Sequence, residues 1–420
     1  MPPKVVEIIS VGEELLLGDT VDTNAAWLAG ELAALGLPVS RISSCGDALC
    51  DIERLVLEAA SRADLVVMTG GLGPTEDDRT RQALAAASGS KLVLDEKILE
   101  HIRSIFRHYG RPMAEKNSIQ AMIPEGAAVI ENPVGTAPGF RLRIGNAEVA
   151  AFPGVPREMK EMFRAGFLPT LLGDEAGRDV LLVRHLHVFG VGESDVDAKV
   201  ADLMRPCPAT AGVGLTVCGG VVTVRITARG SPDVARRLLS DCQSEIEKRL
   251  GDWIFGRDGE TIEQVAGSAL IRSGHTVALA ESCTAGLVCA GLGAVPGISA
   301  SLRGAVVAYS DDVKAELLGV DRGTLRTFGA VSAEVAGEMA RGVRDRMDAG
   351  LGLSITGIAG PTGGSPEKPV GLVFFGLADA QGVRTERKMF RGERTAIQDR
   401  AAKTALNLLR LLVSGGRSGG

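Results

Sequence analysis

A serine and a cysteine stand side by side in AESCTAG, residues 280–286, directly after a run of small apolar residues. Either Ser282 or Cys283 could attack a carbonyl group if a neighbouring base removed its proton. The only histidine in the last third of the chain, His275, lies at the far end of the same predicted strand. Because each strand residue adds about 3.3 Å, a pair of His275 with either nucleophile is disfavoured.

Lysine is the remaining type of base, because a lysine removed from water loses its proton more easily. Four lysines follow the serine in the sequence: Lys314, Lys368, Lys388 and Lys403. Lys314 lies in YSDDVK, where a predicted strand gives way to a helix. Composition alone favours a simpler alternative for this residue, a helix lysine exposed to water.

A glycine-rich loop, in SITGIAGPTGG, could supply the other half of such a site. An apolar strand ends there near Thr356, and backbone amides at Thr356, Gly357 and Gly360 are candidates for holding an oxyanion or a substrate phosphate. Three arginines follow that could bind a phosphate as a fork: Arg391, Arg394 and Arg400. A flexible loop and surface arginines are the alternative interpretation.

The stretch TGGLGPTEDDRT, residues 69–80, points to a different chemistry. Its three glycines let the backbone approach a ligand closely, and the amides at a helix start favour phosphate. Asp77 and Asp78 follow at once, and carboxylates are the ligands that Mg²⁺ prefers. Such a loop suits cleavage of a pyrophosphate bond. A helix start with acidic residues in its first turn is an equally good interpretation, and no Walker A motif is present.

The elements that must position these residues fall into three segments. In residues 1–172, apolar strands alternate with amphipathic helices, which predicts an α/β domain with a parallel sheet and ligand loops after Val11 and Met68. Residues 178–256 read as a small α+β module. Residues 258–414 return to α/β patterning, and the tail at 415–420 is predicted to be disordered. The predicted fold is therefore two parallel or mixed-sheet α/β domains joined by a small module.

Composition narrows the possible partners and the compartment. The net charge of −6 argues against broad nucleic-acid binding, which usually leaves a basic footprint. Neither a signal peptide nor an apolar stretch long enough to span a bilayer is apparent, so we expect no membrane and a cytoplasmic location. The seven cysteines form no CxxC pair, which disfavours disulfides and structural zinc.

Long motifs in both α/β segments resemble the competence/damage-inducible CinA family. They are SVGEELLLGDTVDTNAAWLAGELAALG, GGLGPTEDDRT, NPVGTAPGF and FPGVPREMK in the first segment, and AESCTAG, VPGISASLRGAVVAYSDDVKAELLGV, FGAVSAEVA and KPVGLVFFGLA in the third. The first segment is also similar to the molybdopterin-binding proteins MoaB and MogA, and the third to the nicotinamide mononucleotide deamidase PncC. The family carries a KH-like domain between them, although the GxxG loop of nucleic-acid-binding KH domains is missing here.

For the first segment the resemblance implies an ADP-ribose pyrophosphatase that depends on a divalent metal such as Mg²⁺. It places the phosphate and metal end of the site at these residues: Gly70, Gly71, Gly73, Thr75, Asp77 and Asp78. Asp47 matches a second acidic position, and we expect Asp47 and Asp78 to hold or activate a metal-bound water. Capping of the following helix is the alternative role of Asp47.

For the third segment the resemblance implies a nicotinamide mononucleotide deamidase that needs no cofactor and uses a serine–lysine mechanism. Ser282 is then the nucleophile and Lys314 its base, while Tyr309 and Ser299 complete a hydrogen-bond relay. The resemblance also favours Arg400 as the phosphate ligand, makes Cys283 a packed neighbour and implies a homodimer. One departure is notable, because position 285 is alanine where the family usually has glycine.

Two functions of other classes stay open from the sequence. The chain could be a non-catalytic interaction protein in DNA uptake or repair, which strong salt-dependent DNA binding would favour. It could also be a molybdopterin-binding enzyme, which tight pterin binding without turnover of ADP-ribose would favour.

Overall fold

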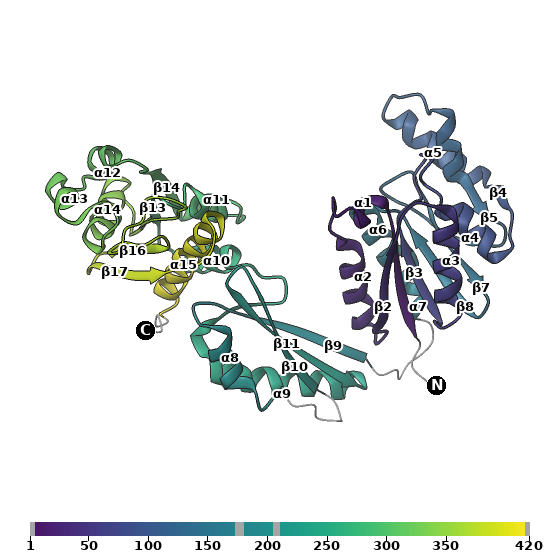
Figure 1. Ribbon diagram of the computed structural model, residues 1–420, viewed down its shortest axis with the longest axis horizontal. Coiled ribbons are helices and arrows are strands. Elements are labelled where there is room, and N and C mark those ends of the chain that lie inside the picture. The colour runs from purple at the N-terminus through teal and green to yellow at the C-terminus, as the bar shows by residue number, and fades with distance from the viewer. Residues whose placement is uncertain (1–4, 173–179, 205–210, 416–420) are drawn as a thin grey trace. The chain divides into compact units, whose positions relative to one another are not determined.

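The computed structural model describes residues 5–172, 180–204 and 211–415. The chain divides into two compact units, Met1–Val183 with Ala228–Leu238 and Arg184–Thr227 with Leu239–Gly420. Figure 1 labels the helices and strands of both units. Within the described ranges no helix is both long and apolar enough to cross a membrane. The tail at 415–420 is predicted to be disordered, and its residues 416–420 lie outside those ranges.

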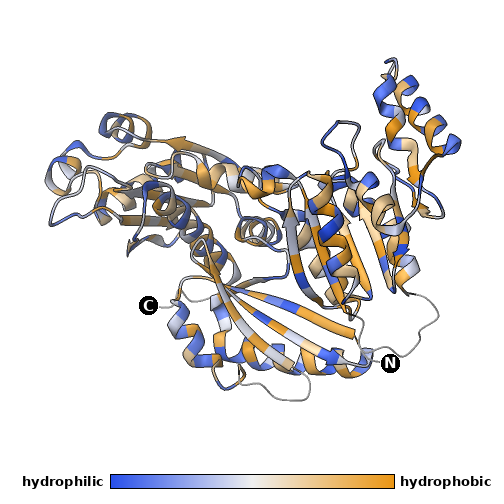
Figure 2. Ribbon diagram, turned by 45° about the vertical axis from the view of Figure 1, so that its right-hand side comes forward, coloured by the Kyte–Doolittle hydropathy of each residue, from blue (hydrophilic) through white to orange (hydrophobic). Residues whose placement is uncertain are grey.

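The first unit is built on a six-stranded sheet with the order β2-β1-β3-β8-β7-β6. The strands are β1 Val6–Val11, β2 Val39–Cys45, β3 Leu65–Thr69, β6 Ala128–Ile130, β7 Gly139–Ile144 and β8 Ala147–Phe152. The first four strands in this order run parallel, whereas β7 pairs antiparallel with both of its neighbours, β8 and β6. The sheet is therefore mixed, with parallel strands where ligand loops were expected, and Figure 2 shows these strands as mostly hydrophobic.

Helices cover both faces of this sheet, because alternate strand residues point to opposite sides. Ile8 packs with Leu28 on one side, and Ile9 packs with Val56 on the other. The helices are α1 Glu13–Leu16, α2 Thr23–Ala34, α3 Leu49–Ala60, α4 Thr80–Ser88, α5 Glu96–His108, α6 Pro156–Met162 and α7 Leu168–Leu172. Strands β4 (Leu92–Leu94) and β5 (Met122–Pro124) form a separate antiparallel pair.

The middle module has a four-stranded sheet with the order β10-β11-β9-β12. Its elements are β9 Val180–Val188, α8 Glu193–Val200, β10 Ala211–Cys218, β11 Val221–Gly230, α9 Pro232–Leu250 and β12 Ile254–Arg257. This is the α+β arrangement that the alternating strand patterns and two helical patterns predicted.

The second unit also contains a five-stranded sheet with the order β14-β13-β15-β16-β17. The strands are β13 Val277–Glu281, β14 Leu302–Val307, β15 Leu351–Gly357, β16 Leu372–Asp379 and β17 Gly382–Met389. The helices are α10 Ile262–Ser273, α11 Leu287–Gly293, α12 Asp311–Leu318, α13 Arg322–Phe328, α14 Ala333–Arg346 and α15 Arg394–Ser414. Because β13 pairs in parallel with β14 and β15, the loops after these three strands meet at one edge. Those loops carry AESCTAG, YSDDVK and TGIAG.

Candidate functional site

The turn after β13 is held in place by a buried carboxylate that the sequence reasoning missed. Glu281 is fully buried, and its side chain accepts hydrogen bonds from the backbone nitrogens of Gly286, Val288 and Cys289 at 2.9, 3.2 and 2.8 Å. The Ser282 nitrogen donates to the Ile355 carbonyl at 3.0 Å, which ties the turn to β15. An acidic residue just before the small residues of a helix start is the signal that could have identified this role.

Cys283, two residues after Glu281, is buried and held in place by a hydrogen bond to its backbone. Its side chain is buried, and its carbonyl accepts a hydrogen bond of 2.7 Å from Gln398 Nε2 on α15. Burial raises the pKa of the Cys283 thiol to about 12. Since the thiolate is the nucleophilic form of cysteine, this thiol is a poor nucleophile near neutral pH. The neighbouring Ser282 is left as the candidate.

Lys314 lies on α12 beside this turn, with only 1% of the residue exposed. Burial lowers the pKa of Lys314, and the Asp311 carboxylate at 3.9 Å opposes that shift. Its Nζ donates a long hydrogen bond of 3.5 Å to the Tyr309 carbonyl. The Cys283 thiol is close enough to influence the same pKa, so the fold brings Lys314 to the Ser282 turn.

The strand periodicity directs the serine side chain toward the same helix. Ala278 and Ala280 pack on the side of the sheet that carries Leu318 of α12. Alternation of the strand puts residue 282 on that same side. Ser282 itself is buried, with 8% of the residue exposed.

Tyr309, Gly360 and Arg394 meet at the rim of this site. Arg394 donates from Nη2 to the Tyr309 hydroxyl at 2.5 Å and from Nη1 to the Gly360 carbonyl at 2.7 Å. Of the three arginines considered from the sequence, Arg394 is therefore the one that the fold brings to the loops after β14 and β15. Tyr309 is 58% exposed, so this pair faces solvent at the entrance.

Thr356 and Gly357 have structural partners of their own. The Thr356 hydroxyl is buried and donates to the Ala330 carbonyl at 2.8 Å. A Cβ at Gly357 would lie 2.6 Å from Cγ2 of Val373, so the close packing of β15 on β16 already requires glycine there. The roles proposed for these two residues consequently rest on their backbone amides.

Ser299 lies at the wrong edge of the sheet for the relay assigned to it. It belongs to the 3₁₀ turn Ile298–Ala300, directly before β14. The start of β14 pairs with Val277, whereas Ser282 follows the other end of β13. The full length of that strand, at about 3.3 Å per residue, separates them. Within one chain the assignment of Ser299 is wrong.

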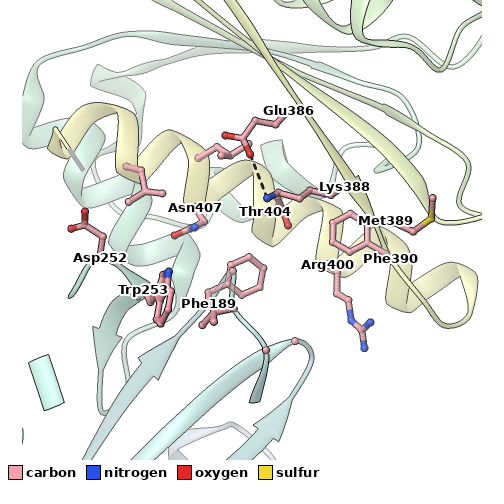
Figure 3. A pocket seen from close by; sticks show the side chains of 16 residues that line it. Phe189, Asp252, Trp253, Glu386, Lys388, Met389, Phe390, Arg400, Thr404 and Asn407 are labelled. Carbon is pink, nitrogen blue, oxygen red and sulfur yellow. Dashed lines mark ion pairs between the residues drawn. The ribbon is translucent and has the colours of Figure 1, made fainter. Parts of the chain in front are cut away.

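Arg400 is also absent from the serine site. Its Nη1 donates to the Arg391 carbonyl at 2.9 Å, and its side chain lines a different cavity (Figure 3). Arg394 and Arg400, about two turns apart on α15, therefore lie at two different places in the fold. The fold therefore does not bring Arg400 to the serine site, where Arg394 lies instead.

In the first unit, the glycine loop after β3 adopts a backbone that only glycine accepts easily. Gly70 and Gly71 have φ values of +104° and +65°. A Cβ at Gly70 would lie 2.0 Å from the Val11 carbonyl oxygen, because the neighbouring loop after β1 is so close. The close approach of the loop after β1 explains why position 70 requires glycine.

Asp78 organises this loop with both of its carboxylate oxygens. They accept from the Gly73 nitrogen at 2.7 Å, the Thr75 nitrogen at 2.8 Å and the Thr75 hydroxyl at 2.5 Å. Arg81 is fully buried beneath the loop and donates to the carbonyls of Leu72 and Gly73. Burial lowers the pKa of Arg81 to about 10, although nearby Asp78 opposes the shift.

A cavity of about 420 Å³ opens above this loop. Its lining includes all but one of the residues predicted for this site: Asp47, Gly70, Gly71, Gly73, Asp77 and Asp78. Thr75, the exception, contributes through Asp78. Three polar residues that the sequence reasoning missed also line the cavity: Glu14, Gln120 and Glu158. They come from separate loops and helices, and no short motif linked them to the glycines.

Asp47 does not cap the helix that follows it. The N-cap of α3 is Ala48, which makes no side-chain bond. Asp47 instead accepts from the Glu13 nitrogen at 3.1 Å, and it faces the cavity. The capping alternative is therefore wrong. The hydroxyl of Thr75 lowers the pKa of the exposed Asp77, which keeps a second carboxylate ionised at this cavity.

Three buried polar atoms near the cavity have no hydrogen-bond partner in the described part of the chain: Ser10 Oγ, Asn24 Oδ1 and Gln120 Oε1. Gln120 lines the main cavity, and the other two residues line a smaller one of about 120 Å³ that shares Gly70 with it. Asn24 Nδ2 already donates to Thr69 and to Gly154. Its oxygen can therefore only accept, which suits ligand hydroxyl groups.

Comparison with known proteins places the chain. A putative competence-damage inducible protein from Halothermothrix orenii is 43% identical over 93% of this chain and 94% of its own length. Another from Moorella thermoacetica is 44% identical over 96% and 97%. The chain belongs to the CinA family. Residues 7–173 match the probable molybdopterin binding domain, residues 183–256 the damage-inducible protein CinA KH domain, and residues 259–413 the CinA C-terminal domain.

A crystal structure of the CinA protein from Thermoplasma acidophilum is similar to one part of the chain. It is 38% identical, covers 40% of this chain and 98% of that chain, and gives a TM-score of 0.38. The curated relatives, in contrast, extend over nearly the whole chain.

The backbone conformation at position 285 suits glycine, the residue that the resemblance led us to expect there. Ala285 has a φ of +53°, in the left-handed region that residues with a Cβ seldom adopt. Ala285 is also exposed, so the methyl group itself meets no obstacle in packing. The departure at this position therefore costs backbone strain and leaves the candidate catalytic groups in place.

The acidic cavity is compatible with a divalent metal without forming a complete cage for one. Among the described residues, no group of three histidine, cysteine, aspartate or glutamate side chains is arranged to hold an ion. Mg²⁺ commonly uses one or two protein carboxylates together with water and substrate phosphates. Asp47 and Asp77 beside the glycine loop suit that mode.

Proposed function

We propose that the C-terminal domain hydrolyses the carboxamide of nicotinamide mononucleotide to give nicotinic acid mononucleotide and ammonia. The observation that carries this proposal is Lys314, a buried lysine with a lowered pKa beside the Ser282 turn. A base for the serine is what the chemistry requires, and the third segment offers no suitably placed histidine. The substrate comes from the resemblance to PncC.

In the proposed reaction, neutral Lys314 accepts the proton of the Ser282 hydroxyl as the oxygen attacks the carboxamide carbon. Backbone amides of the turn or of the Gly357 loop hold the oxyanion. The proton passes to the amide nitrogen, the C–N bond breaks and ammonia leaves. Water then attacks the acyl-serine, which releases the carboxylate and restores Ser282 with Lys314 again as base.

Arg394 is the proposed ligand of the substrate phosphate. It is held by Tyr309 and Gly360 at the entrance, so its guanidinium is positioned before substrate arrives. Not all of its N–H groups are used by these two bonds, and a planar guanidinium can offer two donors to one phosphate.

Release of ammonia from nicotinamide mononucleotide tests the proposal. We expect Ser282→Ala and Lys314→Met to abolish it, while Cys283→Ala and Lys403→Met retain it as matched controls. Loss with Cys283→Ala but not with Ser282→Ala would move the nucleophile to the cysteine. No release by the unaltered protein would refute the substrate.

For the N-terminal domain we propose hydrolysis of ADP-ribose to AMP and ribose 5-phosphate with a divalent metal. The supporting observation is the cavity that combines the glycine loop with Asp47 and Asp77. When bound, the metal would neutralise phosphate charge and lower the pKa of a water. Asp47 and Asp77 would hold it, and Asp78 would shape the loop that binds the phosphates.

Turnover of ADP-ribose, measured as AMP formed with and without a chelator, tests this second activity. We expect activity that chelation removes and added Mg²⁺ restores. Activity that survives complete chelation would contradict the metal. The match to a molybdopterin binding domain makes pterin binding the alternative. Tight pterin binding by a chain that does not turn over ADP-ribose would favour it.

A further inference from the structure

A cavity of about 430 Å³ in the second unit belongs to neither proposed active site. Its walls come from the turn after β9, the 3₁₀ turn Gly251–Trp253, the end of β17 and helix α15 (Figure 3). Neither Ser282 nor Lys314 lines it. Its volume falls within the range of about 300–1,000 Å³ that is usual for small-molecule sites.

One side of the cavity is aromatic. Phe189, Trp253 and Phe390 come from three separate elements and all line it (Figure 3). The Phe189 nitrogen donates to the Trp253 carbonyl at 2.9 Å, which fixes two of these residues relative to each other. Phe189 is mostly packed in the core, and Lys199 Nζ lies 5.2 Å from the centroid of the Trp253 ring. Stacking with a planar ring of a ligand, such as a nucleobase, therefore falls to the parts of Trp253 and Phe390 that line the cavity.

The other side is polar and comes from one face of α15. Arg400, Thr404 and Asn407 follow each other at spacings of four and three residues, so they lie one above another. Thr404 and Asn407 are only 7% and 9% exposed. Burial of polar groups between two packed domains costs free energy unless they find partners, so simple packing would favour apolar residues here.

The amide of Asn407 is oriented as a donor toward the cavity. Its Oδ1 accepts from Arg410 Nε at 3.0 Å, which leaves Nδ2 to donate. A Cβ at Gly190 would lie 3.7 Å from that nitrogen, so Nδ2 faces the turn that forms the opposite wall. A ligand on this side must therefore offer acceptors.

Positively charged side chains at the cavity also favour a ligand with acceptor groups. Among the described residues, no carboxylate lies within ion-pair distance of Arg400, whose Nη1 donates only to a backbone carbonyl. Lys388 is different, because Glu386 lies 3.7 Å away and partly neutralises it. The cavity thus offers an aromatic surface and a guanidinium that no carboxylate of the described residues pairs with.

We propose that this cavity binds a nucleoside monophosphate, with the base against the aromatic residues and the phosphate at Arg400. The ligand would use Thr404 and Asn407 as further polar contacts. This inference does not depend on either proposed activity, since none of its residues belongs to those sites.

The chain contains a natural reporter for this cavity. It has two tryptophans, Trp27 and Trp253, and only Trp253 lines the cavity. In a Trp27→Phe background, we expect AMP to change the fluorescence of Trp253 saturably. Adenosine and ribose 5-phosphate, which each lack one half of the ligand, should bind at least about tenfold more weakly, because each gives up either the stack or the charged hydrogen bonds.

Variants in the same background separate the cavity from other nucleotide sites. Arg400→Gln and Asn407→Leu should each raise the dissociation constant of AMP about tenfold or more. Arg387→Gln is the matched control, because it removes the same charge from β17 at a residue that does not line the cavity, and it should leave the constant unchanged. An unaltered Trp253 signal with AMP would overturn the proposal. So would equal binding by Arg400→Gln, Asn407→Leu and Arg387→Gln, or equally tight binding of ribose 5-phosphate.

Discussion

The turn at Ser282 and the loop at Gly70 differ in which side chains hold the backbone in place. At the turn, Glu281 and Gln398 hold the backbone, and the groups with the proposed chemistry, Ser282 and Lys314, take no part in that work. In the loop, Asp78 is both a predicted metal ligand and the residue that ties the backbone together. At the turn, support comes from residues with no proposed chemistry, whereas in the loop it comes from Asp78, which stands next to the proposed metal ligand Asp77.

This difference shows how the residues of a motif can be divided into those that support the backbone and those that carry the proposed chemistry. A side chain whose hydrogen-bonding capacity is spent on holding a turn or loop together is a supporting residue, whatever its chemical type. By that criterion Glu281 and Asp78 correspond to each other, while Lys314 corresponds to Asp47 and Asp77. Substitutions at the two kinds of position should therefore separate activity from stability.

The largest expected effect is at Lys314. Lys314→Met keeps the length of the side chain and removes the base, so deamidation should fall by about a hundredfold to ten-thousandfold. The folded state should lose nothing, because a buried cation is replaced by an apolar group. Initial rates and thermal melts check both parts. A variant that melts much earlier than the parent would show that Lys314 supports the turn, and the comparison would fail.

In the first unit, substitutions of Asp78 and Asp47 should differ in their effect on stability. Asp78→Asn places an amide group against the nitrogen and hydroxyl of Thr75, so the loop should lose about 1–3 kcal/mol of stability together with ADP-ribose turnover. Asp47→Asn keeps an oxygen for the Glu13 nitrogen, so turnover should fall with stability unchanged. Denaturant unfolding beside AMP formation measures both. Equal stability of the two variants would show that Asp78 is no more structural than Asp47.

Sequence reasoning anticipated which loops lie together at each candidate site because strand ends and glycines are local signals. The β-branched runs before Gly12 and Gly70 predict two parallel strands, whose following loops lie at the same edge of the sheet. The apolar run before AESCTAG predicts a loop at the end of a strand in the same way. The pattern also predicted both α/β domains and the module between them. These features depend on residues near one another in the chain.

The errors concern residues whose position depends on the whole sheet. Ser299 was placed by its motif, but the direction of β14 carries it to the opposite edge. Arg400 and Arg394 lie on one helix, and only the packing of α15 decides which reaches Tyr309. Gln120 and Glu158 come from distant segments, so no spacing could reveal them.

A smaller effect should appear in the pH dependence of stability. Because the pKa of Lys314 is lowered on folding, the unfolded chain binds more protons than the folded one between the folded pKa and the ordinary value of 10.5. The free energy of unfolding contributed by this group should therefore rise with pH through that window. Unfolding of the parent and of Lys314→Met at several alkaline pH values isolates the contribution. A parallel pH dependence in both proteins would contradict the lowered pKa.

The smallest effect should be at Ala285, and it tests whether the turn really is held against strain. Ala285 keeps a left-handed backbone because Glu281, Gln398 and the pairing with β15 determine the turn around it. Ala285→Gly removes the conflict of the Cβ with that backbone and should stabilise the protein by about 1 kcal/mol. Ala290, which is exposed within α11, provides the control, since Ala290→Gly should destabilise by a similar amount. If glycine destabilised both positions alike, residue 285 would have to lie in an ordinary conformation. The contacts of Glu281 and Gln398 would then hold the serine turn less rigidly than the glycine loop is held. In that loop the Val11 carbonyl leaves no room for a side chain at Gly70.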